Sequence, residues 1–230
     1  MKKAGILGGG QLGRMLLQAA ANYPVETYVM EKEADSPAAH LCHHFIKGDI
    51  TNYDDVYYFG KNLDVLTIEI EGVNLEALEK LEAEGIRIYP KPAALRIIKN
   101  KILQKEFYRN QQIPSSEFVV TSSLEELNAQ LGFLPAVHKL ATGGYDGRGV
   151  QVIRKTEDAR LGFNEPAVLE KMIHIKKEIA IIIAVDNSGK TAIYQPVDMV
   201  FDQQLNLLTH QLCPAAKTKK VFRKAEAIAI

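Results

Sequence analysis

The sequence has few cysteines, no excess of charge of either sign and no long apolar run. Its two cysteines, Cys42 and Cys213, are too few for a disulfide framework, so we expect a cytoplasmic protein in which both are buried. Twenty-eight basic residues balance 28 acidic ones, and no long-range positive field exists to attract nucleic acid or an anionic membrane. The apolar stretch after Met1 is too short for an export signal or a membrane span.

What is present is ordinary globular composition. Of the 230 residues, 47% are hydrophobic and 24% are charged, which is enough for one large or two small cores. Internal repeats, low-complexity runs and heptads are lacking. We therefore expect a folded soluble protein without nucleic-acid or membrane partners.

Up to residue 92, short apolar strands alternate with amphipathic helices. Leu12, Met15, Leu16 and Ala19 recur at helical spacing in the first helix, and Gly85 is a plausible stop for the second. The expected strands are 4–7, 26–30, 45–47, 65–70 and 87–89, and the expected helices are 11–22 and 75–84. This alternation predicts an α/β fold that begins with a parallel βαβ, Rossmann-like domain over residues 1–92.

After residue 92 the pattern changes. Residues 93–111 predict one long basic helix, within a connecting segment 93–115, that turns Leu95, Ile98, Ile102 and Leu103 inward. The following strands are expected at 118–120, 136–139, 150–153, 167–170, 178–185 and 191–197, with a hairpin turn at 186–189 and helices at 123–131, near Glu157 and at 218–230. This succession predicts α+β lobes rather than further βαβ winding.

Gly8, Gly10 and Gly13 have the G-x-G-x-x-G spacing between a strand and a helix. That geometry lets backbone N–H groups face a phosphate, but alone it is a weak signal. Glu31, near the end of the second strand, would suit the ribose of a nicotinamide dinucleotide. A bare structural turn and another phosphate-bearing ligand are the alternatives.

A second glycine-rich segment, residues 142–149, lies between two expected strands and follows Lys139. Its four glycines would let backbone amides close around a polyphosphate, while Lys139 and Arg148 supply positive charge. The alternative is a plain glycine-rich hairpin. Farther along, Glu170 ends an apolar strand at which a purine could bind backbone groups, and Glu178 would suit a ribose diol. Spacing alone leaves Glu170 as an ordinary carboxylate at the end of a strand.

The order of these features resembles the ATP-grasp superfamily, in which two α+β lobes hold ATP. Within it, the segments 8–15 (GGGQLGRM), 67–71 (TIEIE), 89–90 (YP) and 143–149 (GGYDGRG) resemble the N5-carboxyaminoimidazole ribonucleotide synthetase family. The resemblance covers essentially the whole chain, and segment 143–149 is its most specific part. It implies ATP-dependent carboxylation of aminoimidazole ribonucleotide with bicarbonate in purine synthesis.

The resemblance also implies a role for each matching residue. Residues 116–173 would form the small ATP-grasp lobe with its glycine lid, and 174–230 the start of the large lobe. The residues implied to bind ATP are Lys101, Lys139, Gly144, Tyr145, Asp146, Gly147, Arg148, Gly149, Val150, Glu170, Lys171, Met172, Ile173 and Glu178. Those implied to bind the ribonucleotide are Gln11, Leu12, Glu69, Glu71, Tyr145, Asp146 and Arg148, the last three being the implied catalytic residues.

Two positions depart from the family pattern. Ala141 stands where relatives commonly carry a basic residue, and Asp202 matches a histidine of some relatives. The family's Mg²⁺ ligands lie beyond residue 230, so no metal ligand is assigned within this chain, which is expected to be truncated and inactive alone. The family further implies a homodimer.

Two other functions are carried as alternatives. One is another ATP-grasp ligase, such as a formate-dependent glycinamide ribonucleotide transformylase, and the other is a nicotinamide-dependent oxidoreductase. A metal site at His40, Cys42, His43 and His44 is not expected, because adjacent His43 and His44 would point apart on a strand.

Overall fold

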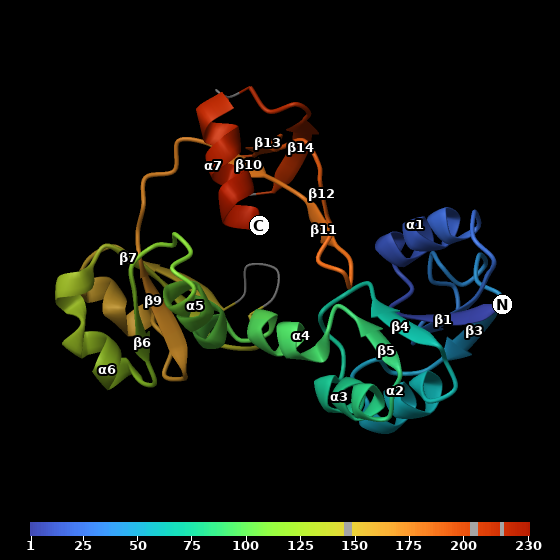
Figure 1. The fold of residues 1–230 in the computed structure, drawn as a ribbon. Coiled ribbons are helices and arrows are strands. Elements are labelled where there is room, and N and C mark those ends of the chain that lie inside the picture. Colours follow the sequence, from blue (N-terminus) through green and yellow to red (C-terminus); the bar gives the residue numbers. More distant parts are fainter. Residues whose placement is uncertain (145–148, 203–206, 217–218) are drawn as a thin grey trace. The chain divides into compact units, whose positions relative to one another are not determined.

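A computed structural model describes residues 1–144, 149–202, 207–216 and 219–230 (Figure 1). The chain forms two compact units, Met1–Gln104 and Lys105–Ile230, and each is described by itself. Among the described residues, no helix combines the length and apolar character needed to cross a membrane.

The first unit is built on a five-stranded parallel sheet with the order β3-β2-β1-β4-β5. Its elements are β1 (Lys2–Leu7), α1 (Gln11–Ala20), β2 (Val25–Glu31), β3 (His44–Lys47), α2 (Tyr53–Gly60), β4 (Val65–Ile68), α3 (Leu75–Ala83), β5 (Arg87–Tyr89) and α4 (Pro92–Ile98). The predicted α/β class and parallel βαβ winding are confirmed.

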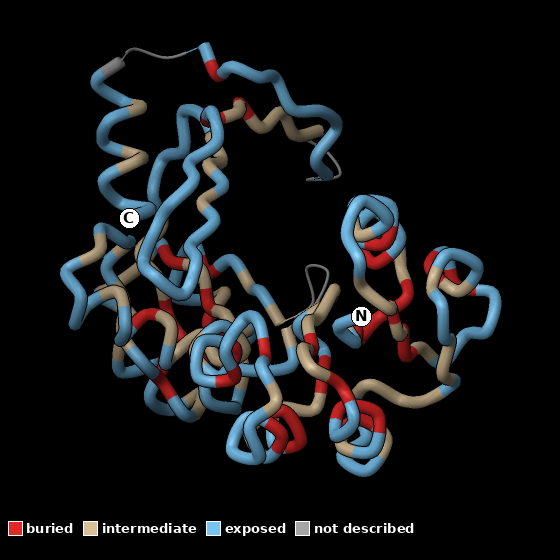
Figure 2. The backbone as a smooth tube through the Cα atoms, turned by 45° about the vertical axis from the view of Figure 1, so that its right-hand side comes forward, coloured by how far each residue is buried: buried red, intermediate tan, exposed pale blue. Residues whose placement is uncertain are grey.

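Alternating side chains on the central strands build a core on each face of this sheet. Figure 2 colours the buried stretches of the backbone red. Leu7 and Met30 pack with α2, α3 and α4 in the larger core. Their neighbours Ile6 and Val29 point to the opposite face and pack with Leu17 of α1. Because both faces are covered, the strands read as continuous apolar runs, which is typical of parallel sheets.

Helices α1 and α2 differ from what the sequence pattern indicated. In α1 the buried residues are Gly13 and Leu17, whereas Leu12 and Met15 are 63% and 62% exposed. Helix α2 was not predicted, because its Tyr- and Phe-rich segment has weak helix propensity. Asn52 nevertheless caps it by accepting a hydrogen bond from the backbone N–H of Asp55.

The single helix predicted over residues 93–111 is wrong, because the structure has two helices there. Helix α4 ends at Ile98 and α5 runs from Lys101 to Asn110. Between them, the Asn100 side chain accepts hydrogen bonds from the N–H groups of Ile102 and Leu103 at 2.9 and 3.2 Å and so starts a new helix. The predicted inward positions Ile98 and Leu103 are exposed.

The second unit begins with an antiparallel four-stranded sheet of order β6-β9-β7-β8. Its elements are β6 (Phe118–Thr121), α6 (Leu124–Ala129), the 3₁₀ helix η1 (Leu131–Phe133), β7 (Ala136–Leu140), β8 (Val150–Ile153), the 3₁₀ helix η2 (Thr156–Leu161) and β9 (Ala167–Lys171). Ser123 caps α6 through the N–H of Glu126. The predicted strands of this segment are confirmed.

Two further sheets follow in this unit, with strand orders β10-β13-β14 and β11-β12. The elements are β10 (Glu178–Ala180), β11 (Ile183–Val185), β12 (Thr191–Ile193), β13 (Val197–Phe201), β14 (Leu208–Leu212) and α7 (Lys219–Ala229). The hairpin turn at 186–189 is confirmed. The continuous strands predicted at 178–185 and 191–197 are wrong, since each divides between two sheets, and Pro196, which lacks an N–H, separates β12 from β13. Strand β14 was not predicted.

Two smaller expectations also change. Cys213 is exposed and Cys42 is only partly buried, so the prediction that both cysteines are buried is wrong. His43 hydrogen-bonds Thr27, while His44 pairs with Glu26 at 2.8 Å. Within the described ranges, no group of three or more His, Cys, Asp or Glu side chains is gathered as a metal site would require.

Candidate functional site

The glycine loop, residues 142–149, joins the antiparallel neighbours β7 and β8. Lys139 pairs with Val150 across this hairpin, and the Leu140 N–H donates to the carbonyl of Gly149 at 2.9 Å. The strands therefore carry Lys139 to the base of the loop, where the sequence pattern placed a phosphate-binding cation.

Two positions near the ends of this loop favour glycine. Gly143 and Gly149 both have φ of +74°, in the left-handed region, and a Cβ on Gly149 would lie 2.9 Å from the Cα of Gly144. Four residues lie outside the described part of the chain, and the roles predicted for them stay predictions: Tyr145, Asp146, Gly147 and Arg148.

Beside the base of the loop, two lysines share one glutamate, forming the lysine–glutamate cluster of Lys105, Lys139, Glu170 and Ser116. One carboxylate oxygen of Glu170 lies 3.1 Å from Lys139 Nζ. The other lies 3.0 Å from Lys105 Nζ and accepts a hydrogen bond of 2.7 Å from the Ser116 hydroxyl. Two ammonium groups thus face a single carboxylate.

The strand register explains why Lys139 and Glu170 meet. Strand β9 lies between β6 and β7, with Glu170 opposite both Phe118 and Val137. Lys139 is two residues beyond Val137, so its side chain lies on the same face of the sheet as Glu170, diagonally across from it.

Glu170 stays ionised in this setting. Burial raises the pKa of its carboxyl, but hydrogen bonds from Ser116 and Lys105 and the charge of Lys139 outweigh burial, so the pKa lies below its ordinary value. The Lys105 ammonium also donates to the Ser115 hydroxyl at 2.6 Å and the Ser116 hydroxyl at 2.9 Å. The buried charges are therefore both paired and hydrogen-bonded.

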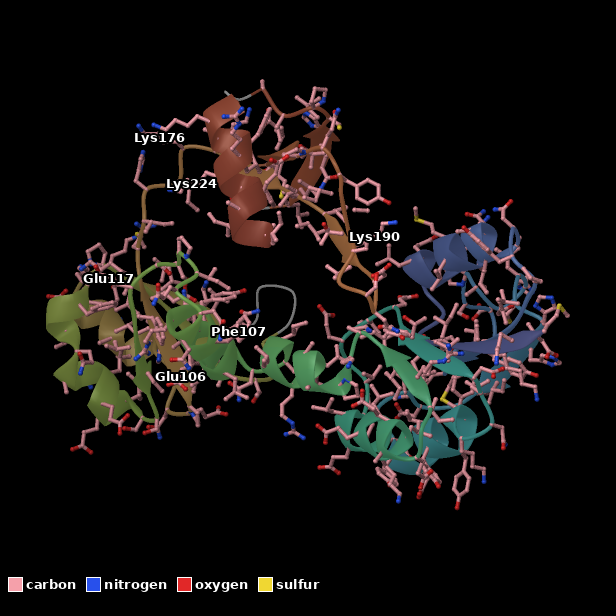
Figure 3. All side chains as sticks on the ribbon, in the orientation of Figure 1. Glu106, Phe107, Glu117, Lys176, Lys190 and Lys224 are labelled. Atoms are coloured by element: carbon pink, nitrogen blue, oxygen red, sulfur yellow. The ribbon has the colours of Figure 1, made fainter. Side chains whose placement is uncertain are left out.

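Sequence reasoning missed Lys105. The available signal was its position on α5, four residues after Lys101, which places the two side chains on the same helix face. Its neighbours Glu106 and Phe107 are exposed (Figure 3), whereas Lys105 is buried. Lys101 is itself half-buried and belongs to the first unit.

The end of β9 offers fewer backbone groups than the sequence pattern suggested. The N–H groups of Lys171 and Met172 already donate to the carbonyls of Glu117 and Pro135. Lys171 Nζ donates to the carbonyl of Phe133 at 2.8 Å. Ile173 is exposed, and its N–H donates to no other described residue. A purine at this strand end would therefore meet Ile173 first.

Glu178 begins β10 and is exposed. The preceding residue, Lys177, pairs with Asp198, whose side chain is almost fully buried and also accepts a hydrogen bond from the Ala216 N–H at 2.9 Å. This interaction anchors the start of β10 and leaves the Glu178 carboxylate facing solvent.

His138, next to Lys139, is fully buried. Its Nδ1 accepts a hydrogen bond from the Phe163 N–H at 3.2 Å, so the ring proton is on Nε2, which donates to the Thr121 hydroxyl at 2.9 Å. Burial lowers the pKa of the imidazole. A neutral histidine therefore fixes β7 just before the glycine loop.

The first glycine turn, residues 8–13, is occupied by carboxylates of the chain itself. The Gly9 N–H donates to Glu31 and the Gly13 N–H to Glu69, each at 3.0 Å. A Cβ on Gly10 would lie 2.5 Å from a Glu69 oxygen. Two negative charges therefore lie where a dinucleotide pyrophosphate would bind, which argues against a nicotinamide site.

Of the described residues expected to bind the ribonucleotide, Gln11 and Leu12 belong to this turn and Glu69 bonds to it. Gln11 and Leu12 are exposed on the first turn of α1. Glu69, half-buried, follows β4, and Glu71 is exposed two residues farther on. The structure holds Glu69 at the turn through the hydrogen bond that the Gly13 N–H donates to it, whereas among the described residues Glu71 makes no hydrogen bond or ion pair to the turn.

The two departures from the family pattern lie at strand ends. Ala141 is buried and its N–H donates to the Pro166 carbonyl at 2.9 Å. Asp202 follows β13 and its N–H donates to the Leu207 carbonyl at 2.8 Å. Both positions are held by backbone bonds whatever their side chains do.

Comparisons with known proteins show which families the two parts of the chain resemble. Residues 1–99 match the ribonucleotide synthetase pre-ATP-grasp domain, and residues 106–230 match the ATP-grasp domain. A chloroplastic phosphoribosylaminoimidazole carboxylase of Vigna aconitifolia is 35% identical over 85% of this chain and 36% of its own length. An N5-carboxyaminoimidazole ribonucleotide synthase of Brucella melitensis is 33% identical over 98% of this chain and 64% of its own length.

A solved structure shows the same likeness. The Aspergillus clavatus N5-carboxyaminoimidazole synthase, in complex with ADP and 5-aminoimidazole ribonucleotide, is 30% identical with a TM-score of 0.85, over 99% of this chain and 61% of that one. The chain thus spans between 36% and 64% of the length of these relatives. The resemblance indicated by the motifs is confirmed, and because the ATP-grasp match alone covers more than half of its residues, the chain belongs to the ATP-grasp family.

Proposed function

We propose that the chain acts in the ATP-dependent carboxylation of 5-aminoimidazole ribonucleotide by bicarbonate to N5-carboxyaminoimidazole ribonucleotide, a carbon–nitrogen ligation of de novo purine synthesis. The observation that carries the proposal is the lysine–glutamate cluster at the base of the glycine loop, where Lys139 lies 3.1 Å from Glu170. Relatives of this name, one of them in complex with ADP and the ribonucleotide, support it.

The reaction begins with transfer of the γ-phosphoryl group of ATP to bicarbonate. This forms carboxyphosphate and ADP, and carboxyphosphate then releases phosphate and delivers CO₂ to the amine of the ribonucleotide. The protein's task is to align the reactants, balance the phosphate charge and exclude water. Lys101 and Lys139 would contact the phosphates, assisted by the backbone of Gly144, Gly149 and Val150.

The nucleoside part of ATP would bind at the end of β9 and the start of β10. The Ile173 N–H, which donates to no other described residue, would donate to adenine, beside the segment Glu170–Met172. The exposed carboxylate of Glu178 would accept hydrogen bonds from the ribose hydroxyls.

The ribonucleotide would bind at the first glycine turn. Gln11 and Leu12 are exposed there, and Glu69, held by the Gly13 N–H, would use its remaining lone pairs to accept from the substrate. Glu71 would act from the adjacent segment. Tyr145, Asp146 and Arg148, predicted to bind both substrates and to act in catalysis, are proposed on sequence resemblance alone.

The family implies Mg²⁺ with the ATP. The described residues do not fit such a site, because they gather no group of three or more carboxylate, histidine or cysteine side chains. We therefore place no metal ligand on them and derive no step through the ion.

Nucleotide binding and turnover test the proposal separately. We expect isothermal titration to detect weak ADP binding by the chain. We expect phosphate release with ATP, bicarbonate and the ribonucleotide to be slow or nil, because the described residues gather no metal site. Absence of ADP binding would overturn the nucleotide site. A robust rate would instead show that the metal site lies within this chain.

Two alternative functions are separated by their substrates. Titration with NADH tests a nicotinamide-dependent oxidoreductase, which the carboxylates Glu31 and Glu69 at the first glycine turn disfavour. For another ATP-grasp ligase, such as a formate-dependent glycinamide ribonucleotide transformylase, turnover with formate and glycinamide ribonucleotide in place of bicarbonate and aminoimidazole ribonucleotide is the deciding measurement.

The proposal includes a cytoplasmic homodimer. It rests on the family resemblance and on the expectation of a reducing compartment from two unpaired cysteines. Sedimentation equilibrium measures the assembly directly, and a monomer at all concentrations would contradict the dimer.

A further inference from the structure

Lys105 is buried beside the proposed nucleotide site, although no role in nucleotide binding was assigned to it. Its side chain is 6% exposed, against 14% for Glu170 and 31% for Lys139. Burying an ammonium is costly unless hydrogen bonds and an opposite charge compensate. Here Ser115, Ser116 and Glu170 provide that compensation.

The cluster divides the Glu170 carboxylate between two partners. One oxygen meets Lys105 and the Ser116 hydroxyl, and among the described residues the other meets only Lys139. Of the two ammonium groups, only that of Lys139 is substantially accessible to solvent. One carboxylate and two ammoniums leave one net positive charge, and it is exposed at Lys139.

We propose that Lys105 is a positioning residue for nucleotide binding: it neutralises and orients Glu170, so that the ammonium of Lys139 keeps its charge available for a phosphate. This inference rests on the proposed function, because it takes Lys139 as a phosphate contact. Without Lys105, Glu170 would be balanced by Lys139 alone, and an incoming polyphosphate would compete with that carboxylate.

The proposal makes an unusual prediction about removing charge. The substitution Lys105→Met takes away the ammonium at similar length, lowers the net charge of the cluster from one to zero, and should weaken ADP binding about tenfold. Adding Glu170→Gln removes the carboxylate as well and returns the net charge to that of Lys139. Because Glu170 is itself a proposed ATP-binding residue, the expected result is partial recovery: the double variant should bind ADP at least about threefold more tightly than Lys105→Met.

A structural role for Lys105 would give a different result. If Lys105 only supported packing, the double variant would bind ADP as weakly as Lys105→Met or more weakly, because it perturbs the cluster further. The double variant also guards against misfolding, since it leaves neither a buried unpaired ammonium nor a buried unpaired carboxylate. Thermal unfolding of each variant reports folding independently of affinity.

The experiment is isothermal titration of ADP into the chain and its variants. Lys155→Met is the matched control, because it removes one positive charge of the same unit from a side chain that is 70% exposed, and it should leave the affinity unchanged. Weakening by Lys105→Met with recovery in the double variant supports the proposal. Equal affinity of Lys105→Met and the unsubstituted chain, or weakening without recovery, overturns it. Absence of ADP binding by the unsubstituted chain overturns the proposed function itself. That outcome is distinguishable from failure of the Lys105 proposal, which is seen only in the variants.

Discussion

The two glycine segments of this chain look alike in sequence but differ in the charge built around them. At the first glycine turn, the N–H groups of Gly9 and Gly13 already donate to Glu31 and Glu69. At the glycine loop, the preceding strand carries Lys139, which belongs to a cluster of two ammonium groups and one carboxylate. Glycines permit a ligand to approach the backbone closely, but the nearest fixed charge decides whether that ligand presents a phosphate or a hydrogen-bond donor there.

The largest loss of stability should come from a substitution in the first glycine turn. In Gly13→Ala, the new Cβ would meet the Gly8 carbonyl oxygen at 2.9 Å and a Glu69 oxygen at 2.8 Å. Overpacking and the loss of the Glu69 bond should outweigh the gain in helix propensity and lower the free energy of unfolding by about 2 kcal/mol. Urea unfolding measures it.

Gly72→Ala is the control for that substitution. Gly72 belongs to the same unit, and a Cβ there would have no neighbour within 4 Å. The two variants should therefore differ in stability by most of the loss at Gly13. Equal stability of the two variants would mean that the contact of Gly13 with Glu69 does not stabilise the first glycine turn.

The second test concerns the charge at the glycine loop. Lys139→Met should weaken ADP binding by about tenfold, because it removes the accessible ammonium of the cluster. Titration calorimetry measures the affinity. Lys2→Met, which removes an exposed ammonium of the first unit, should change nothing. If Lys2→Met weakened binding and Lys139→Met did not, the comparison between the two segments would be reversed.

Acid should weaken the region before the glycine loop. Burial lowers the pKa of His138 below its ordinary 6.5, so as the pH falls the imidazole is protonated in the unfolded chain before it is protonated in the folded one. Above pH 6.5 this histidine costs no stability. Below pH 6.5 the free energy of unfolding should fall by at most about 1.4 kcal/mol per pH unit. Glu170, whose pKa is also lowered, adds a further loss as the pH falls below 4.5.

Urea unfolding at pH 7.5 and pH 5.5 measures the histidine contribution. His138→Gln removes the titrating group while keeping a side chain that can hydrogen-bond, and should flatten the difference between the two pH values. An unchanged pH dependence in this variant would show that His138 is not the group responsible.

The smallest effect should come from Gly143→Ala. Gly143 has φ of +74°, but a Cβ there would have no atom of the described residues within 4 Å. Only the left-handed backbone would be strained, at about 1 kcal/mol. If urea unfolding showed a larger loss of stability for Gly143→Ala than for Gly13→Ala, the expected difference between the glycine loop and the first glycine turn would be contradicted.

Periodicity predicted the strands of the first unit because buried parallel strands are apolar on both faces. It missed α2, whose Tyr- and Phe-rich segment becomes a helix through its Asn52 cap and its packing on α3. It also joined α4 to α5, because the interruption depends on one side-chain amide, that of Asn100, which periodicity does not detect. Local hydrogen bonds decided both cases.

The sequence predicted only part of the candidate site, because motifs reveal some of its residues and long-range contacts place the others. The glycine loop, Lys139 and Glu170 carry sequence motifs, and the strand register brings the latter two together. Lys105 carries no motif. Its helical spacing from Lys101 was the available signal, and its place in the cluster depends on a contact with Glu170, 65 positions later. The engagement of Glu69 with Gly13 was likewise invisible, since the two are far apart in sequence.

The place of β9 between β6 and β7 has an evolutionary consequence. Neighbouring residues of a strand face opposite ways, so one residue inserted between Ala167 and Glu170 would turn the carboxylate to the other side of the sheet, away from both lysines. Insertions in this lineage should accumulate in the connections that flank the strand and be purged from the strand itself.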